Sequence, residues 1–256
     1  MARIAIVTGS DSGIGRATAV ALAQAGCDVG VTWHTDEDGA RETAREVEAK
    51  GRRAEVRRLD TSQIAEAVRT AEELMDALGG IDVWVNNSGT GQSTPALETD
   101  EATFRHVIDT DLIGAFFLAQ TAAKRMVAQG RGGRIVNVTS VHEHAPLDGA
   151  VSYVAAKHGL GGVTKNLALE LAVHGITVNS VAPGEISTPM TGQEDTDPHT
   201  QGRPGVPAGR PGDAREIAAA IVHLASAEAS YTTGSSYVCD GGMLLMGPSA
   251  NQIAME

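Results

Sequence analysis

Aromatic residues, cysteine and long apolar runs are all scarce in this chain of 256 residues. Aromatic side chains make up 3% of it, which gives little support for a large flat apolar ligand, although aliphatic walls could hold one. No apolar run reaches the roughly 18 residues that a membrane helix needs. Cys27 and Cys239 lie far apart without a CxxC partner, so a cysteine-based metal site is not expected. Two buried free thiols are expected instead.

Positive charge is also in deficit, because the formal net charge is -12. A net negative charge of this size argues against nucleic acid or an anionic membrane as a partner. It says little about a small anion such as a cofactor phosphate, which local groups can hold. The chain starts with strand-like sequence directly after Met1, so we expect no signal peptide and a cytoplasmic location.

Short apolar runs alternate with longer helical patterns, and this alternation is typical of βαβ units around a parallel sheet. The fold class expected is therefore α/β, as one Rossmann-type doubly wound domain over residues 1–256 with about seven strands and helices on both faces. The expected strands are 3–8, 28–32, 54–59, 81–86, 134–140, 176–182 and 236–239. The expected helices are 13–26, 36–50, 62–78, 100–128, 150–174 and 213–226.

One stretch, residues 187–212, breaks this rhythm with five prolines and five glycines. A loop of this length inside a compact domain is usually functional or disordered. It follows the sixth strand, near the edge where ligands bind, so we expect a substrate lid, with a mobile connector as the alternative.

The first strand ends in a glycine-rich turn that predicts a dinucleotide site. Gly9 allows a sharp turn, Gly13 lets the backbone approach a pyrophosphate, and Gly15 lets the next helix pack closely. The free N–H groups at the start of that helix favour an anion. The turn comprises Gly9, Ser10, Asp11, Ser12, Gly13, Ile14 and Gly15.

Tyr153 and Lys157 form the best candidate for acid–base chemistry. They are four residues apart on an expected helix, so their side chains share a face. A nearby cation stabilises a phenolate, and hydride transfer to a carbonyl needs an acid to protonate the alkoxide. Ser140 ends the fifth expected strand, where its hydroxyl could bind the substrate oxygen.

These motifs resemble the short-chain dehydrogenase/reductase family across nearly the whole chain. The matching features are Thr8-Gly9-x-x-x-Gly13-Ile14-Gly15, Asn86-Asn87-Ser88-Gly89, Ser140, Tyr153-x-x-x-Lys157, Pro183-Gly184 and Asp240-Gly241-Gly242. The resemblance implies an NAD(P)-dependent carbonyl reductase or alcohol dehydrogenase. It also implies cofactor contacts from Asp60, Thr61, Asn87, Ser88, Gly89, Tyr153, Lys157, Pro183, Gly184, Ile186 and Thr188. Where the family has an asparagine that supports a proton relay to the lysine, this chain has Asp111, a relay candidate with a structural role in a helix kink as the alternative.

The choice of cofactor depends on the end of the second strand. An acidic residue there would bind the ribose of NAD and repel the phosphate of NADP, but Trp33 takes that position. We therefore expect NADP to be favoured over NAD, with His34 and Thr35 at the phosphate and Arg16 or Arg41 further away. Against NADP, Ser12 stands where relatives that use it often have a basic residue.

The substrate is less defined. His142 and His144 are two residues apart without an evident third ligand, so they are expected to line the substrate pocket and no metal is expected. Met190 and Gln193 are expected lid contacts. Small ketones, diketones, sugars, ketoesters and 3-ketoacyl thioesters stay open, and a non-catalytic NAD(P)-binding sensor or scaffold subunit is the rival class. The resemblance implies a homo-oligomer, commonly a tetramer, packed through the helices after strands four and five and the C-terminal segment.

Overall fold

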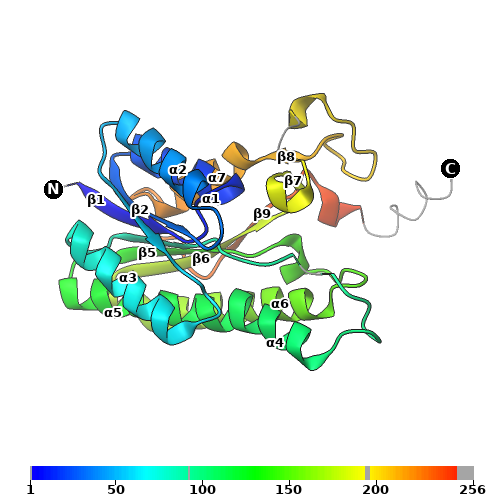
Figure 1. The fold of residues 1–256 in the computed structure, drawn as a ribbon, viewed down its shortest axis with the longest axis horizontal. Helices are drawn as coiled ribbons and strands as arrows, with labels where there is room; N and C mark the ends of the chain where they lie inside the picture. The colour runs from blue at the N-terminus through cyan, green and yellow to red at the C-terminus, as the bar shows by residue number, and fades with distance from the viewer. Residues whose placement is uncertain (1, 92, 194–196, 247–256) are drawn as a thin grey trace.

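The chain folds into three layers, with one parallel sheet between two groups of helices (Figure 1). A computed structural model describes residues 2–91, 93–193 and 197–246. The sheet order is β3-β2-β1-β4-β5-β6-β9, and every neighbouring pair is parallel. Its strands are β1 (Arg3–Val7), β2 (Cys27–Trp33), β3 (Ala54–Arg58), β4 (Val83–Asn86), β5 (Gly133–Val138), β6 (Ile176–Pro183) and β9 (Ser236–Cys239). The predicted doubly wound fold is confirmed.

Helices cover both faces of the sheet and bury a separate apolar cluster on each. On one face lie α1 (Gly13–Gln24), α2 (Glu37–Ala49) and α7 (Ala214–Ala225). On the other lie α3 (Ile64–Leu78), α4 (Glu101–Ile108), α5 (Ala115–Gln129) and α6 (Val151–Leu171). In the described part of the chain, no helix has the length and apolar character to cross a membrane.

The sequence analysis expected one continuous helix over residues 100–128, and this expectation was wrong. The structure divides it into α4, a π-helical turn over Asp109–Gly114, and α5. The turn packs closely against the residues just after β3. Only glycine allows this contact at position 114, because a Cβ atom there would lie 2.2 Å from the carbonyl oxygen of Thr61. The turn carries Asp111, and π-helical turns are frequent at functional sites.

Three further details differ from the sequence-based expectation. The fifth strand ends at Val138, so Ser140 lies two residues beyond it and begins a short 3-10 turn, Val141–Glu143. Two short strands, β7 (Ile186–Ser187) and β8 (Gly212–Asp213), pair in parallel and hold both ends of the 187–212 segment together. Cys27 is buried, whereas Cys239 is partly exposed, and both thiols are free.

Candidate active site

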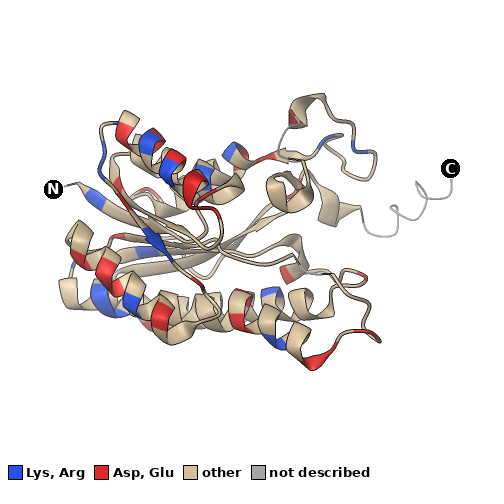
Figure 2. Cartoon of the chain, in the orientation of Figure 1, with Lys and Arg blue, Asp and Glu red and all other residues tan. Residues whose placement is uncertain are grey.

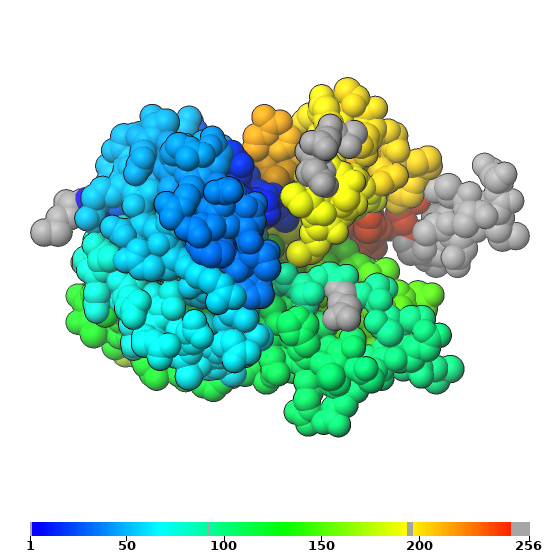
Figure 3. All heavy atoms as spheres, in the orientation of Figure 1, coloured from blue at the N-terminus to red at the C-terminus, as the bar shows by residue number. Residues whose placement is uncertain are grey.

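A cavity of about 790 Å³ opens at the carboxyl edge of the sheet, beside the point where the strand order reverses between β1 and β4. Open α/β sheets bind ligands at this position. Figure 3 shows a recess between the yellow segment that follows β6 and the green segment that precedes α4. Residues of both segments line the cavity, among them Met190 on one side and Thr90 on the other.

The glycine-rich turn at the start of α1 fits a cofactor pyrophosphate. Gly9 and Gly13 have φ angles of +58° and +51°, a backbone conformation that residues with a Cβ atom rarely adopt. At Gly15 a Cβ atom would lie 2.0 Å from the carbonyl oxygen of Gly9, so only glycine fits there. No acidic residue occupies the first turn of α1, which leaves its N–H groups and dipole available to an anion. The residues present therefore form a cradle for a dinucleotide.

The catalytic candidates meet at the other end of the same cavity. Tyr153 and Lys157 both project from α6, and the Lys157 Nζ atom lies 5.4 Å from the centre of the Tyr153 ring. Ser140 also lines the cavity, and its Oγ atom accepts a hydrogen bond of 3.2 Å from the backbone N–H of His142. This bond leaves the Ser140 hydroxyl hydrogen free to point at a substrate oxygen.

Lys157 forms a buried ion pair with Asp111. The Nζ and Oδ2 atoms are 3.1 Å apart, and the two side chains are 5% and 0% exposed. Burial alone would lower the pKa of Lys157, but the Asp111 carboxylate and Tyr153 outweigh it and raise that pKa above its usual range. The second carboxylate oxygen of Asp111 accepts a bond of 2.8 Å from the backbone N–H of Thr90. The aspartate therefore holds the lysine protonated beneath the tyrosine.

The end of the cavity near β2 and β3 is acidic. Asp11, His34, Thr35, Asp60 and Thr61 line it, and the Nε2 atom of His34 lies 3.3 Å from Asp60 Oδ2. Burial and the nearby charge of Asp36 raise the pKa of Asp11. Burial opposes the charge of Asp60, but hydrogen bonds from Ser62 overcome it and lower the pKa of that carboxyl. These carboxylates lie where a cofactor's adenosine half would bind.

Most of the predicted cofactor residues line the cavity, and three do not. The cavity wall includes Gly9, Asp11, Ser12, Gly13, Ile14, His34, Thr35, Asp60, Thr61, Asn87, Ser88, Gly89, Pro183, Gly184, Ile186 and Thr188. Ser10 is fully buried, and its hydroxyl bonds the carbonyl oxygen of Val7 and the N–H of Thr32. Gly15 lies beneath the turn against Gly9. Trp33 packs on the apolar cluster beneath α1, α2 and α7 and not in the cavity.

The predicted substrate residues divide in the same way. His142 and Met190 line the cavity. His144 lies elsewhere, with its Nε2 atom 2.9 Å from Ser236 Oγ, and Gln193 bonds Ser187 and Glu185. Within the described residues, no group of three His, Cys, Asp or Glu side chains is placed to hold a metal ion.

Sequence reasoning missed several contributors to the site. Thr90, Leu147 and Met243 line the cavity, and Glu143 is a buried carboxylate behind it. Thr90 directly follows Asn86-Asn87-Ser88-Gly89, so its position next to that motif was the available signal. Met243 likewise directly follows Asp240-Gly241-Gly242, and Glu143 lies between His142 and His144, whereas nothing in the sequence around Leu147 pointed to it.

The fold, the glycine turn and the Ser–Tyr–Lys arrangement together define a nicotinamide-dependent oxidoreductase. A family model described as enoyl-(acyl carrier protein) reductase matches residues 9–244. The uncharacterized oxidoreductase YohF of Escherichia coli (strain K12) is 51% identical over 251 residues, which cover 98% of this chain and 99% of that protein. The chain therefore belongs to the short-chain dehydrogenase/reductase family.

Two solved structures agree with this assignment. Acetoin dehydrogenase YohF from Salmonella typhimurium is 50% identical with a TM-score of 0.92, and acetoin dehydrogenase from Enterobacter cloacae is 51% identical with a TM-score of 0.91. Each match covers 97% of this chain and 98% of the other. The chain is an NAD(P)-dependent carbonyl reductase or alcohol dehydrogenase, as its motifs predicted.

Proposed function

We propose that this enzyme interconverts a small α-hydroxyketone or 1,2-diketone with the corresponding alcohol. The observation that supports the reaction type is the meeting of Ser140, Tyr153 and Lys157 at one end of a cavity whose other end is a dinucleotide cradle. The substrate class is suggested by the acetoin dehydrogenases, which share half of their residues with this chain.

The site residues divide the work of carbonyl reduction. The nicotinamide, when bound, supplies the hydride that reaches the carbonyl carbon. Ser140 donates a hydrogen bond to the carbonyl oxygen and holds it beside Tyr153. The Tyr153 hydroxyl gives its proton to the oxygen as negative charge develops there, and the Lys157 ammonium stabilises the phenolate that is left. In alcohol oxidation the same groups act in reverse, with Tyr153 as the base.

Asp111 keeps the lysine charged during this cycle. Both members of the Lys157–Asp111 pair are almost inaccessible to water, so without the carboxylate the lysine would tend to lose its proton. An ammonium ion stabilises a phenolate, whereas a neutral amine does not. Asp111 therefore acts through Lys157 as a positioning residue.

The segment 187–212 is proposed as the substrate lid. Met190 lines the cavity and is 64% exposed, as expected for an apolar side chain that substrate would cover. The β7–β8 pair holds the two ends of the segment together at Ile186–Ser187 and Gly212–Asp213. Residues 194–196 lie outside the described residues.

The charges around the adenosine end favour NAD over NADP, which revises the preference drawn from the sequence. A 2′-phosphate would come close to Asp11 and Asp36, and like charges repel. The two arginines considered as its partners are engaged, since Arg16 pairs with Glu46 and Arg41 with Glu37. Of the two residues expected at the phosphate, His34 faces Asp60 and Thr35 carries no charge, while Arg58 donates to the His34 carbonyl oxygen over 3.2 Å.

Dissociation constants for NADH and NADPH test this choice. The wild-type protein should bind NADH more tightly, and Asp11→Asn should narrow the gap by about fivefold, because one like charge is worth roughly 1 kcal/mol at a partly exposed site. Tighter binding of NADPH by the wild-type protein would contradict the proposal. Glu98→Gln removes an equal charge away from the cavity lining and serves as the control.

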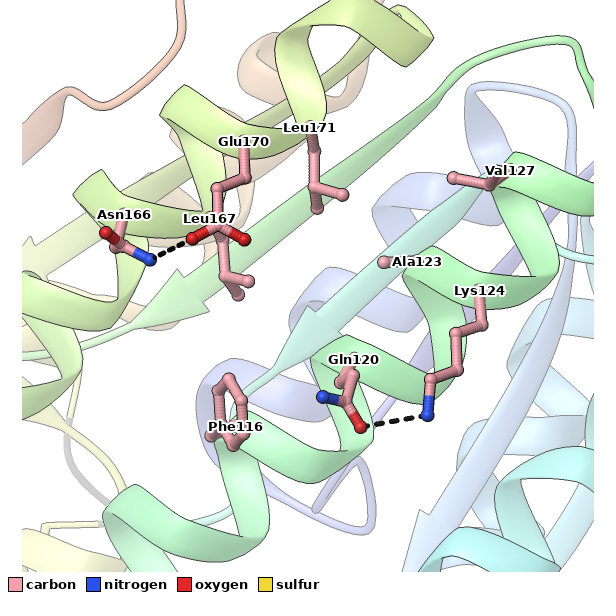
Figure 4. Close-up of a pocket in the computed structure, with 9 residues that line it drawn as sticks. All are labelled: Phe116, Gln120, Ala123, Lys124, Val127, Asn166, Leu167, Glu170 and Leu171. Atoms are coloured by element: carbon pink, nitrogen blue, oxygen red, sulfur yellow. Dashed lines mark hydrogen bonds between the residues drawn. The ribbon is translucent and has the colours of Figure 1, made fainter.

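A second copy of the chain is proposed as a partner. Helices α5 and α6 flank an open groove of about 400 Å³, with Phe116, Ala123 and Leu167 on its apolar floor and Lys124 and Glu170 at its edges (Figure 4). Next to it, Leu169 and Val173 are 78% and 84% exposed. Exposed apolar side chains beside an apolar groove are typical of an interface between subunits.

A carrier-bound ketoacyl thioester is the less favoured substrate. An acidic carrier would need a basic face, and Figure 2 shows acidic and basic residues interspersed along the helices. Two basic residues, Arg125 in α5 and Arg131 just after it, already pair with Asp76 and Asp82. A free small carbonyl compound fits this charge pattern better.

Tyr153→Phe tests the reaction itself. With NADH and 3-hydroxy-2-butanone or butane-2,3-dione, turnover should fall by at least about 10²-fold, the usual scale for loss of a general acid. NADH binding, followed by its fluorescence, should persist, because the ring is kept. Unchanged turnover in this variant would refute the mechanism, and absence of turnover in the wild type with any carbonyl compound would favour a non-catalytic cofactor-binding protein.

A further inference from the structure

His142 is a polar side chain in the cavity wall to which carbonyl reduction assigns no task. It lies in the short turn after Ser140, and its ring is edge-on to the Tyr153 ring with 6.2 Å between the ring centres. Both residues line the cavity. His142 is therefore next to the group that meets the reacting oxygen, on the substrate side of the site.

The hydrogen bond at one ring nitrogen determines what the other nitrogen can do. The Nδ1 atom of His142 lies 3.1 Å from the carbonyl oxygen of Ala145. A carbonyl oxygen can only accept, so Nδ1 must carry a hydrogen. In the neutral imidazole, Nε2 is then an acceptor, and none of the described residues forms a hydrogen bond with it. The ring offers the cavity a hydrogen-bond acceptor.

The turn that carries His142 is fixed from behind by Glu143. This side chain is 7% exposed, and its Oε2 atom accepts hydrogen bonds from Thr139 (2.7 Å), Ser180 (3.1 Å) and Ser236 (3.1 Å). The backbone N–H of Glu143 also donates to the carbonyl oxygen of Ser140 over 2.8 Å. A side chain held on such a support is oriented before the substrate arrives.

We propose that His142 is a specificity-determining residue whose Nε2 atom accepts a hydrogen bond from a hydroxyl group on the carbon next to the reacting carbonyl. The inference rests on the proposed carbonyl reduction. While Ser140 and Tyr153 hold the carbonyl oxygen, the neighbouring His142 meets the second oxygen of an α-hydroxyketone, or of a vicinal diol in the reverse direction. A plain ketone leaves this acceptor unpaired, and sites built to bind a hydroxyl discriminate strongly against analogues that lack it.

The test compares 3-hydroxy-2-butanone with 2-butanone in the wild-type enzyme, His142→Phe and His142→Gln, with NADH as reductant. Phe keeps the ring next to Tyr153 but has no acceptor. Its ratio of kcat/KM for the hydroxyketone to kcat/KM for the ketone should fall by about tenfold or more, because a buried unmade hydrogen bond costs roughly 1–3 kcal/mol. Gln provides an amide oxygen as acceptor, so its ratio should stay within about threefold of the wild type.

Each outcome separates this inference from the proposed function. A ratio that is the same in the Phe variant and the wild type, or equal losses in the Phe and Gln variants, would overturn the role of His142 while leaving carbonyl reduction in place. If the wild-type enzyme reduced neither compound nor any other carbonyl, the proposed function would fail and this inference with it. NADH binding and the thermal midpoint of each variant show that it is folded, and if the Phe variant is unfolded, His142→Leu takes its place.

Discussion

Replacing Asp111 with Asn should move the alkaline limit of activity to lower pH. The substitution removes the carboxylate whose Oδ2 atom lies 3.1 Å from Lys157 Nζ. At an effective dielectric constant of about 20, Coulomb's law gives roughly 5 kcal/mol for two charges at this separation, or close to four pKa units before relaxation. The variant retains the burial of Lys157, which opposes its charge, and only the weaker support of Tyr153 on the other side. We therefore expect the amine to become neutral at a pH at least one to two units lower than in the wild type.

The direction of the Lys157 pKa shift also determines how the ion pair contributes to the free energy of unfolding at each pH. Because the pKa of Lys157 is raised in the folded protein, the contribution of the pair is complete below the unfolded lysine value of about 10.4. It is lost only as pH rises through the higher folded value. At neutral pH, Asp111→Asn should lower the free energy of unfolding by about 3 kcal/mol, the lower end of the usual cost of breaking a buried pair, because the lysine can shed its proton.

Two assays measure the prediction. The first is kcat as a function of pH between 6 and 10, and the second is urea denaturation of the wild type, Asp111→Asn, Lys157→Met and the double variant. Asp109→Asn, in the same π-helical turn, removes the same charge, and Asp109 forms no ion pair with any described residue, so this variant serves as the control. If Asp111→Asn gave the same pH profile and the same stability loss as that control, the assigned role of the buried pair would be wrong.

Two other changes follow from the geometry. Gly15→Ala places a Cβ atom 2.0 Å from the Gly9 carbonyl oxygen, so NADH should bind at least about tenfold more weakly and the thermal midpoint should fall. Gly162→Ala, in α6, is the control, because the added Cβ atom would meet nothing within 4 Å. This variant should be neutral or stabilising by up to about 1 kcal/mol. Similar losses of NADH affinity in the Gly15 and Gly162 variants would refute the role of the glycine-rich turn in cofactor binding. Leu169→Glu should dissociate the proposed oligomer in sedimentation velocity, whereas Leu97→Glu, at a fully exposed leucine away from the groove lining, should not. An unchanged mass for Leu169→Glu would exclude this interface.

The parts of the fold that follow local periodicity could be predicted from the sequence. The order of strands and helices follows from apolar runs of strand length alternating with helical patterns. The pairing of Tyr153 with Lys157 follows from their helical spacing, and the glycine turn follows from steric needs that only glycine meets. Each of these features is decided by residues close together in the chain.

Features that depend on distant partners could not be predicted. The π-helical turn at Asp109–Gly114 differs from an α-helix by one residue in its hydrogen-bond spacing, which an apolar pattern over one turn does not reveal. The β7–β8 pair joins two residues to two others about 25 positions later. Trp33 is different, because its position could have been predicted. It alternates in β2 with Val29 and Val31, and this period of two places its side chain on the same core face, away from the cofactor.

Glu143 connects β9, the last strand of the described residues, to the catalytic turn. Three strands that are far apart in sequence, β5, β6 and β9, are joined at one carboxylate oxygen through residues at or beside them, Thr139, Ser180 and Ser236. Among the described strands β9 pairs only with β6, so loss of this oxygen would weaken the attachment of β9 and of the turn of Ser140 together. The amide protons of Ser140–Glu143 and of β9 should then exchange with solvent as one cooperative unit, so the final strand shares in holding the substrate wall in place.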